Sequence, residues 1–488
     1  MKFFVEIQDA RQLANVIAAL KIIDPQAEVT EEHYDLRLIV EYSSNFWVRI
    51  WAPDLPEDEN LWEMQDQDIF DPRYQESDYP KRLKELIRLG IISLLGKRFD
   101  RKPIWGTLSA VRPTKIFHHL RQRGFSVAET RQKLLTIYAL TPEITDLLIE
   151  IGTRQEKFFQ PARTVSLYIG IPFCPSRCRY CSFAAVSLET HHHLVKGFLE
   201  ALHLEIAATR QLIREHGFQV ESVYIGGGTP TSLNLADFAE LLQAVQGSLV
   251  SEHTREFTVE AGRPETIDAD KIQAMKNAGV TRVCVNPQTM KDETLQLIGR
   301  RHSVAQFIQA VMMVEQMSHF IVNMDLILGL PGENGADFLQ SCQQVLQLKP
   351  ENITIHTLAP KRAAAWHKDF AALDLTQEQD IGKAWNEALS MLRRENYFPY
   401  YIYRQRSILA EQANIGLARP ETENIYNIQM MEERETILGL GGGAITKWVF
   451  GSDYQVLRLQ NPKCPATYHR DIGKLIVKKA QQTRLLLG

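Results

Sequence analysis

The sequence predicts an α/β protein whose middle region forms a parallel (β/α)6 barrel, complete or partial. Two observations favour this fold. Short runs rich in β-branched residues alternate with helical patterns, and glycine or polar residues stand where the runs end. The six predicted strands lie near residues 165–170, 222–227, 256–260, 282–286, 320–329 and 352–357. The predicted helices lie near residues 191–216, 235–249, 269–278, 303–317 and 335–348, with a shorter one after Met290.

Residues 1–160 are predicted to form an N-terminal α+β accessory domain. Alternating apolar residues predict strands at 3–8, 36–42 and 46–51. Between Asp54 and Asp78 there are ten acidic residues against a single Arg, a pattern typical of a solvated loop. Four helices are expected after it: near 80–95, after Pro113, after the capping box of Ser126 and Glu129, and from Thr141-Pro142 to about residue 154.

The rest of the chain is divided into a barrel core, residues 161–375, and a C-terminal α/β extension, residues 376–488. The extension is expected to hold helices at 376–395, 428–438 and 467–486, together with the segments Pro399–Arg404 and Gly439–Ala444. The sequence shows no internal repeat and no low-complexity segment.

Three cysteines within eight residues are the strongest chemical signal in the chain. Cys174, Cys178 and Cys181 account for half of the six cysteines among 488 residues. Three thiolates can ligate three irons of a cubane [4Fe–4S] cluster, which leaves one iron open to a non-protein ligand. A disulfide framework is disfavoured by the scarcity of cysteine. A structural zinc site would need a fourth ligand, and the nearest candidates, His191–His193, are read as polar surface.

The other candidate site residues also stand at predicted strand ends. Gly226–Thr231 (Gly-Gly-Gly-Thr-Pro-Thr) directly follows a strand, and glycines there let the backbone approach a ligand, although a plain tight turn would look the same. Functional groups of parallel barrels sit at the carboxyl ends of the strands. Four residues of later units fit that rule: Glu260, Gln288, Asp325 and Ala359.

The composition excludes some classes of partner and suggests a compartment. A net charge of −4 gives no electrostatic case for nucleic-acid binding. No apolar run reaches about 18 residues, so we expect no membrane span. The N-terminal segment alternates like a strand and reaches an acidic residue already at Glu6, which does not fit a signal peptide. A cluster needs reduced thiols, so we expect a cytoplasmic protein.

With these motifs the chain resembles the radical S-adenosylmethionine (SAM) superfamily, and within it the oxygen-independent coproporphyrinogen III oxidase (HemN-like) family. The cysteine loop and the Gly-Gly-Gly-Thr-Pro-Thr segment resemble the superfamily, and Tyr168–Cys174, Asp325–Gly332 and Gly439–Ala444 resemble the family. Four further segments are most similar to its HemZ branch, the coproporphyrinogen dehydrogenases: Trp105–Thr114, Val259–Pro264, Val285–Met290 and Tyr400–Gln405.

This resemblance implies an oxidoreductase of heme and porphyrin biosynthesis. In the family, reduction of the cluster cleaves SAM to a 5′-deoxyadenosyl radical, which removes a hydrogen from a substrate propionate. Loss of CO₂ then leaves a vinyl group, and two such steps convert coproporphyrinogen III to protoporphyrinogen IX. The implied partners are this tetrapyrrole, a reducing electron donor such as flavodoxin or ferredoxin, and an unknown electron acceptor.

The resemblance also implies roles for individual residues. Cys174, Cys178 and Cys181 match the cluster ligands. The positions that match SAM contacts are Tyr168, Gly227, Gly228, Thr229, Glu260, Gln288, Arg300, Asp325 and Ala359. Four aromatic residues could either wall a tetrapyrrole or belong to the core: Phe183, Tyr400, Tyr401 and Tyr403.

The chain departs from the family pattern at two positions. Gly170 stands where members usually carry His, and Phe183 stands where the characterised decarboxylases have a fourth cysteine. The second departure is shared with the heme-chaperone-like branch. Two alternatives to the dehydrogenase therefore stay open: a heme-binding or heme-delivery protein, and another radical-SAM enzyme such as a methyltransferase.

Overall fold

The computed structural model describes residues 1–100, 103–108, 111–159, 163–317, 320–359, 361, 364–367, 378–405 and 409–487. These form two compact units, Met1–Thr153 and Arg154–Gly488, which we describe separately. The predicted domain boundaries at 160/161 and 375/376 lie outside the described residues, so the division into three domains stays a prediction.

The N-terminal unit is built on a five-stranded sheet with the order β2-β1-β3-β4-β5. Its strands are β1 (Lys2–Ile7), β2 (Glu28–Val29), β3 (Leu36–Tyr42), β4 (Trp47–Trp51) and β5 (Leu61–Gln65). Two helices pack together beside it, α1 (Leu13–Ile23) and α2 (Tyr79–Arg98). The three predicted strands are confirmed as β1, β3 and β4.

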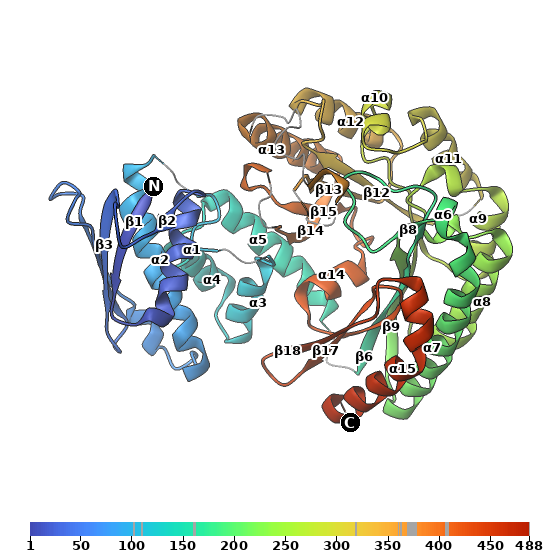
Figure 1. The fold of residues 1–488 in the computed structure, drawn as a ribbon, viewed down its shortest axis with the longest axis horizontal. Helices are drawn as coiled ribbons and strands as arrows, with labels where there is room; N and C mark the ends of the chain where they lie inside the picture. The colour runs from blue at the N-terminus through green and yellow to red at the C-terminus, as the bar shows by residue number, and fades with distance from the viewer. Residues whose placement is uncertain are drawn as a thin grey trace. The chain divides into compact units, whose positions relative to one another are not determined.

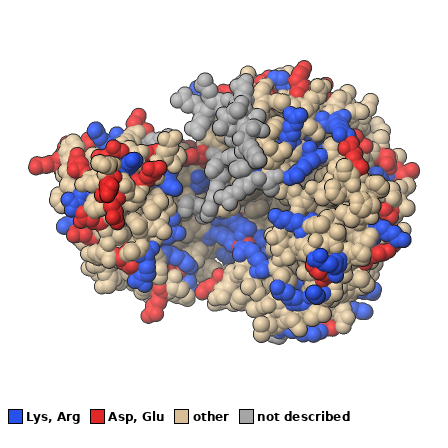
Figure 2. Space-filling model, in the orientation of Figure 1, with Lys and Arg blue, Asp and Glu red and all other residues tan. Residues whose placement is uncertain are grey.

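The prediction of a loop throughout Asp54–Asp78 is wrong, because β5 lies inside it. The segment Leu61–Gln65 pairs with β4 as an edge strand. Exposed and half-buried side chains alternate along it, with Trp62 and Met64 half-buried. Acidic side chains are prominent on the visible surface of this unit (Figure 2). Acidic residues are common on exposed edges, where charge opposes further strand pairing.

Three helices complete the N-terminal unit: α3 (Thr114–Gln122), α4 (Val127–Thr136) and α5 (Pro142–Gln155), whose last residues belong to the second unit. The capping box at the start of α4 is confirmed. Glu129 N–H donates to Ser126 Oγ at 3.2 Å, and Ser126 N–H donates to Glu129 Oε2 at 2.7 Å. These bonds satisfy backbone donors that a helix start leaves free.

The second unit contains an eleven-stranded sheet, in which all six predicted parallel strands are confirmed (Figure 1). They are β6 (Thr164–Ile171), β9 (Gln219–Gly227), β10 (Glu256–Glu260), β11 (Arg282–Cys284), β12 (Ile321–Leu328) and β13 (Asn352–Thr357), and neighbours in this list pair in parallel. Among the described strands the sheet does not close on itself. The observed fold is thus a partial (β/α)6 barrel, and its carboxyl strand ends share one edge.

The helices between these strands bury one apolar face each. They are α7 (Val195–His216), α8 (Leu235–Leu249), α9 (Ala269–Asn277), α10 (Asp292–Leu297), α11 (Val304–Met317) and α12 (Gly335–Gln347). α7, α8, α9 and α11 form an outer layer in Figure 1. The predicted helix 191–216 begins earlier, as short α6 (Leu188–His191) and a 3-10 turn over His192–Leu194.

The C-terminal strands extend both edges of the same sheet. β14 (Phe398–Tyr403) and β15 (Asn414–Ala418) continue it antiparallel beyond β13, and β16 (Thr436–Gly441) pairs in parallel with β6. β17 (Ile445–Phe450) and β18 (Gln455–Gln460) follow β16. The helices here are α13 (Glu378–Arg394), α14 (Ile425–Glu432) and α15 (Pro465–Leu487). In the described residues no helix is long and apolar enough to cross a membrane.

The predicted helix 428–438 is wrong in its second half. Glu433 has a left-handed backbone, φ 52°, and ends α14. The fully buried run that starts at Thr436 then forms β16 against β6. Pairing with a core strand therefore overrides the local helical pattern. The start of the predicted helix 376–395 lies outside the described residues.

Candidate cofactor site

The cysteine loop leaves the carboxyl end of β6, the first parallel strand. Cys174 ends the two-residue strand β7 (Phe173–Cys174), which pairs with β8 (Val186–Ser187). Cys178 is buried, Cys174 and Cys181 are half-buried, and all three are free thiols. Cys181 N–H donates to the carbonyl of Cys178 at 3.2 Å, which forms a tight turn between the last two cysteines.

Two of the three sulfurs accept hydrogen bonds from other barrel units. Thr229 Oγ1 donates to Cys174 Sγ at 3.5 Å, and Arg263 Nη1 donates to Cys178 Sγ at 3.3 Å. Burial raises the pKa of Cys174 to about 11 and also raises the pKa of Cys181, so these thiols need a counter-charge to ionise. Iron supplies such a charge, and donors aimed at the sulfurs suit thiolates.

No group of three His, Cys, Asp or Glu side chains in the described residues converges as ligands of a single metal ion. A cubane cluster makes a different demand, because each cysteine ligates a separate iron. Three free thiols on one loop, two of them with N–H or O–H donors, fit that demand.

The glycine segment after β9 lies directly against the cysteine loop. Gly227 has φ +108°, a conformation that side chains disfavour, and a Cβ at Gly228 would lie 2.4 Å from the Phe173 carbonyl. Gly228 N–H donates to the Ile171 carbonyl at 2.8 Å, and Thr229 N–H to that of Phe173 at 2.7 Å. The close backbone contact with Ile171 and Phe173 therefore requires glycine, and the predicted approach to a ligand stays a prediction.

Glu260 is held at the end of β10 by two neighbours. Tyr224 Oη donates to Oε1 at 2.7 Å, and Gly227 N–H donates to Oε2 at 3.0 Å. Burial raises the pKa of this carboxyl to about 7, although both hydrogen bonds oppose the shift. A carboxylate can accept about four hydrogen bonds, so Glu260 keeps capacity for ligand hydroxyl or ammonium groups.

Three tyrosine rings form a stack beside Glu260. Tyr168 lies 6.1 Å from Tyr224 and 5.8 Å from Tyr426, measured between ring centroids, and Tyr224 lies 4.6 Å from Tyr426. Tyr426 belongs to α14, so a C-terminal helix takes part in the site. The sequence predicted Tyr168 but gave no signal for Tyr224 or Tyr426.

Asp325 and Gln288 are linked through the backbone of β12. Gln288 N–H donates to the Asp325 carbonyl at 2.9 Å, and Gln288 has φ +69°. Asn286 Nδ2 donates to Asp325 Oδ2 at 2.9 Å, and His356 Nε2 lies 3.6 Å from the same oxygen. Tyr403 Oη lies 3.3 Å from His356 Nδ1. These contacts put His356 in the same polar group as Asp325.

Arg300 is buried and bridges three loops. Its Nη2 donates to the carbonyls of Gly262 and Asn286, the latter at 2.8 Å, and Nη1 donates to Tyr180 Oη at 3.3 Å. Its Nε is buried and has no hydrogen-bond partner among the described residues, so this N–H is left for a ligand. Ala359 lies buried just past β13.

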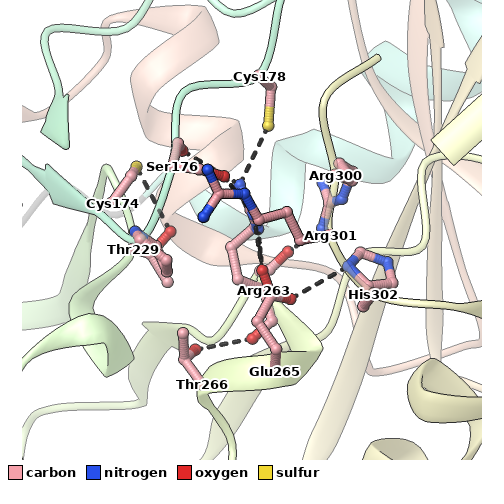
Figure 3. A network of polar contacts seen from close by, with 12 residues as sticks. Cys174, Ser176, Cys178, Thr229, Arg263, Glu265, Thr266, Arg300, Arg301 and His302 are labelled. Atoms are coloured by element: carbon pink, nitrogen blue, oxygen red, sulfur yellow. Dashed lines mark hydrogen bonds and ion pairs between the residues drawn. The ribbon is translucent and has the colours of Figure 1, made fainter. Parts of the chain in front are cut away.

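Arg263 is the main site residue that the sequence analysis missed (Figure 3). It reaches the cysteine loop at Ser176 and Cys178 and is paired with Glu265 at 2.6 Å. Glu265 also lies 3.1 Å from His302 Nδ1. The segment Val259–Pro264 was noted only for its resemblance, and no spacing rule connects its arginine to cysteines about 85 positions earlier.

The structure describes the environment of Gly170 and Phe183, the two positions that depart from the family pattern. A Cβ at Gly170 would lie 2.7 Å from the Gly442 carbonyl, so the close approach of the Gly439–Ala444 segment excludes a side chain there. Phe183 is 63% exposed, an unusual position for a phenylalanine. Tyr400 and Tyr401 are core residues, whereas half-buried Tyr403 contacts His356.

Comparisons with known proteins agree with this fold. Residues 168–345 match the family model of the radical SAM superfamily, a class that uses a [4Fe–4S] cluster and SAM. The chain is 35% identical to the oxygen-independent coproporphyrinogen-III oxidase-like protein HemZ of Bacillus subtilis over 406 residues, 82% of this chain and 81% of that one. It is 31% identical to the heme chaperone HemW of Bacillus subtilis over 282 residues, 57% of this chain and 70% of that one.

Among solved structures, the fold matches the Escherichia coli coproporphyrinogen III oxidase HemN, a radical SAM enzyme. The TM-score is 0.52 at 21% identity, over 67% of this chain and 73% of that chain. The fold and the cysteine loop thus define a radical SAM protein. Within that class, the chain belongs to the HemN-like family of oxygen-independent coproporphyrinogen-III oxidase-like proteins that includes HemZ.

Proposed function

We propose that the protein is an oxygen-independent coproporphyrinogen III dehydrogenase, which converts two propionates of its substrate to vinyl groups and releases CO₂. The observation that carries this proposal is the similarity to HemZ over 82% of the chain. Fold alone would not identify the substrate, because radical SAM barrels serve many reactions.

In this proposal Cys174, Cys178 and Cys181 ligate the cluster. When bound, the cluster and SAM supply one-electron chemistry that produces a hydrogen-abstracting radical. The chain positions these groups. Thr229 and Arg263 donate to cysteine sulfurs, and Glu260 accepts from the SAM ribose or amino group. The other proposed SAM contacts are Tyr168, Gly227, Gly228, Gln288, Arg300, Asp325 and Ala359.

The proposed electron donor is an acidic, low-potential protein such as flavodoxin or ferredoxin. Arg177 and Arg179 flank Cys178 and are both exposed. Exposed cations beside a redox centre attract an acidic partner and increase the association rate.

Anaerobic turnover tests this function. Reconstituted protein is incubated with SAM, a low-potential reductant and coproporphyrinogen III, and the products are measured by mass spectrometry. We expect 5′-deoxyadenosine, CO₂ and protoporphyrin after oxidation, and a Cys178→Ser variant as matched control should give none of them. Absence of both porphyrin product and 5′-deoxyadenosine from the wild-type reaction would refute the proposal. A mass gain of one methyl group would indicate a methyltransferase instead.

A second candidate function is heme binding and delivery. It is favoured by the similarity to HemW and by Phe183, which stands at the position of the fourth cysteine. An exposed aromatic ring can contact a flat tetrapyrrole face without any decarboxylation chemistry. Stoichiometric heme binding in a spectroscopic titration, together with no loss of CO₂ in the turnover assay, would support this candidate.

A further inference from the structure

We propose that Arg263 is a positioning residue that sets the reduction potential of the cluster through its hydrogen bond to Cys178. The proposal assigns a role beyond ligation and SAM contact, and it holds for either candidate function. It rests on the proposed ligation of the cluster by the three cysteines.

The Arg263 guanidinium is buried and directed at the cysteine loop. Its side chain is 4% exposed. Nη2 donates to Ser176 Oγ at 2.9 Å, and Nη1 is shared between the Ser176 carbonyl and Cys178 Sγ, both at 3.3 Å. Three contacts to two residues of the loop fix the loop and the donor together.

A second layer of residues holds the guanidinium in this orientation. Glu265 accepts from Arg263 Nε at 2.8 Å and lies next to His302 (Figure 3). Burial alone would raise the pKa of Glu265, but His302 and Arg263 outweigh it and lower the pKa to about 2, so Glu265 is ionised. Thr266 Oγ1 donates to the Arg263 carbonyl at 2.7 Å and fixes the backbone.

The electrostatic consequence has a definite sign. Reduction adds one negative charge to the cluster and its thiolates, and no proton or covalent bond changes. A buried N–H donor with a positive charge at Cys178 Sγ stabilises the reduced form more than the oxidised form. Burial strengthens this effect, because little water screens it. Arg263 therefore makes the electron easier to deliver.

The test is a potentiometric titration followed by electron paramagnetic resonance. Arg263→Gln removes the charge but keeps a polar side chain, and Arg263→Lys keeps the charge but loses the fork of donors. The matched control is Arg301→Gln, which removes a nearby exposed cation that pairs with Glu189 and contacts no cysteine. Iron content and circular dichroism are measured for each protein.

At a fixed potential near the wild-type midpoint, Arg263→Gln should lower the ratio of reduced to oxidised cluster about tenfold, ~59 mV for a one-electron couple. Arg263→Lys should give a smaller shift, and Arg301→Gln little or none. Wild-type midpoints in both Arg263 variants with full cluster content would overturn the inference. If Arg263→Gln does not fold, Arg263→Lys decides by the same criterion. Wild-type protein that binds no iron would instead refute the proposed ligation.

Discussion

Two buried arginines, each paired with a glutamate, stand at opposite ends of the parallel strands and differ in what they hold. At the amino end, Arg282 pairs with Glu256 at 3.1 Å and also donates to Asn323 Oδ1 and to the carbonyls of Thr422 and Glu423. Every one of these partners belongs to the strands or to the segment before α14. At the carboxyl end, Arg263 pairs with Glu265 and donates to the cysteine loop.

The difference shows how one kind of ion pair serves two purposes. The amino-end pair is saturated, because Glu256 also accepts from the backbone N–H groups of Ile425 and Tyr426. It ties the C-terminal segment to the barrel. At the carboxyl end, Arg263 of the pair donates a hydrogen bond to the Cys178 sulfur, which is proposed to ligate iron. The contacts at the amino end therefore join parts of the fold, whereas those at the carboxyl end meet at the proposed ligand site.

The largest effect is expected when a cysteine at the carboxyl end is replaced. Cys178→Ser should abolish cluster binding, because two thiolates cannot hold the cubane, while the apo protein keeps its fold. Cys342→Ser is the matched control, since Cys342 is buried in α12 away from the loop. Iron and sulfide analysis after anaerobic reconstitution measures the result. Full iron content in Cys178→Ser would contradict the assignment of ligands.

A large loss of stability is expected from the amino-end pair. Arg282→Met leaves Glu256 buried without its partner, which should lower the free energy of unfolding by about 3–5 kcal/mol. Urea unfolding of the apo protein, followed by circular dichroism, measures this change. Arg263→Met is the comparison at the other end, and we expect a smaller loss there because Glu265 keeps His302. Equal losses would remove the distinction between the two pairs.

Two buried carboxyl groups, one near each end of the strands, have a raised pKa in the folded protein and should make its stability depend on pH. Burial raises the pKa of Glu260 from 4.5 to about 7, and burial beside Glu221 raises that of Glu435. A raised pKa means that the folded state binds the proton more tightly, so this stabilisation is present at low pH and is lost as the pH rises through the folded pKa.

Between about pH 4.5 and 7 the free energy of unfolding of the wild type should therefore fall as Glu260 ionises. In Glu260→Gln this fall should be smaller by about 2 kcal/mol. Glu435→Gln should have a similar effect, shifted to higher pH. SAM affinity, measured by calorimetry on the cluster-loaded protein, should fall at least tenfold in Glu260→Gln only. A fall of the same size in Glu435→Gln would show that both ends serve the ligand.

The two ends also differ in how far the sequence could predict them. The six parallel strands and the cysteine loop follow from local patterns, namely β-branched runs and ligand spacing. Arg263, Tyr224 and Tyr426 carry no local signal, because their contacts with Cys178, Glu260 and Tyr168 exist only after the sheet has formed. The same long-range pairing converted the end of the predicted helix 428–438 into β16.

The smallest effects are expected from two hydroxyl groups on one strand. Tyr224 Oη donates to Glu260, and Ser222 Oγ, two residues earlier on β9, donates to Ser166 Oγ at 2.7 Å. Removing one buried hydrogen bond costs about 1 kcal/mol. Tyr224→Phe should weaken SAM binding several-fold, because Glu260 loses the donor that orients it.

Ser222→Ala should lower the free energy of unfolding by about 1 kcal/mol. It should leave SAM affinity unchanged, because Ser166, the partner of Ser222, donates to Glu435 at the amino end of the strands. Calorimetry and urea unfolding on both variants give a two-by-two comparison on a single strand. Weaker SAM binding in Ser222→Ala would mean that these two neighbouring positions of β9 are coupled, and the separation of stability from ligand binding would then fail within one strand.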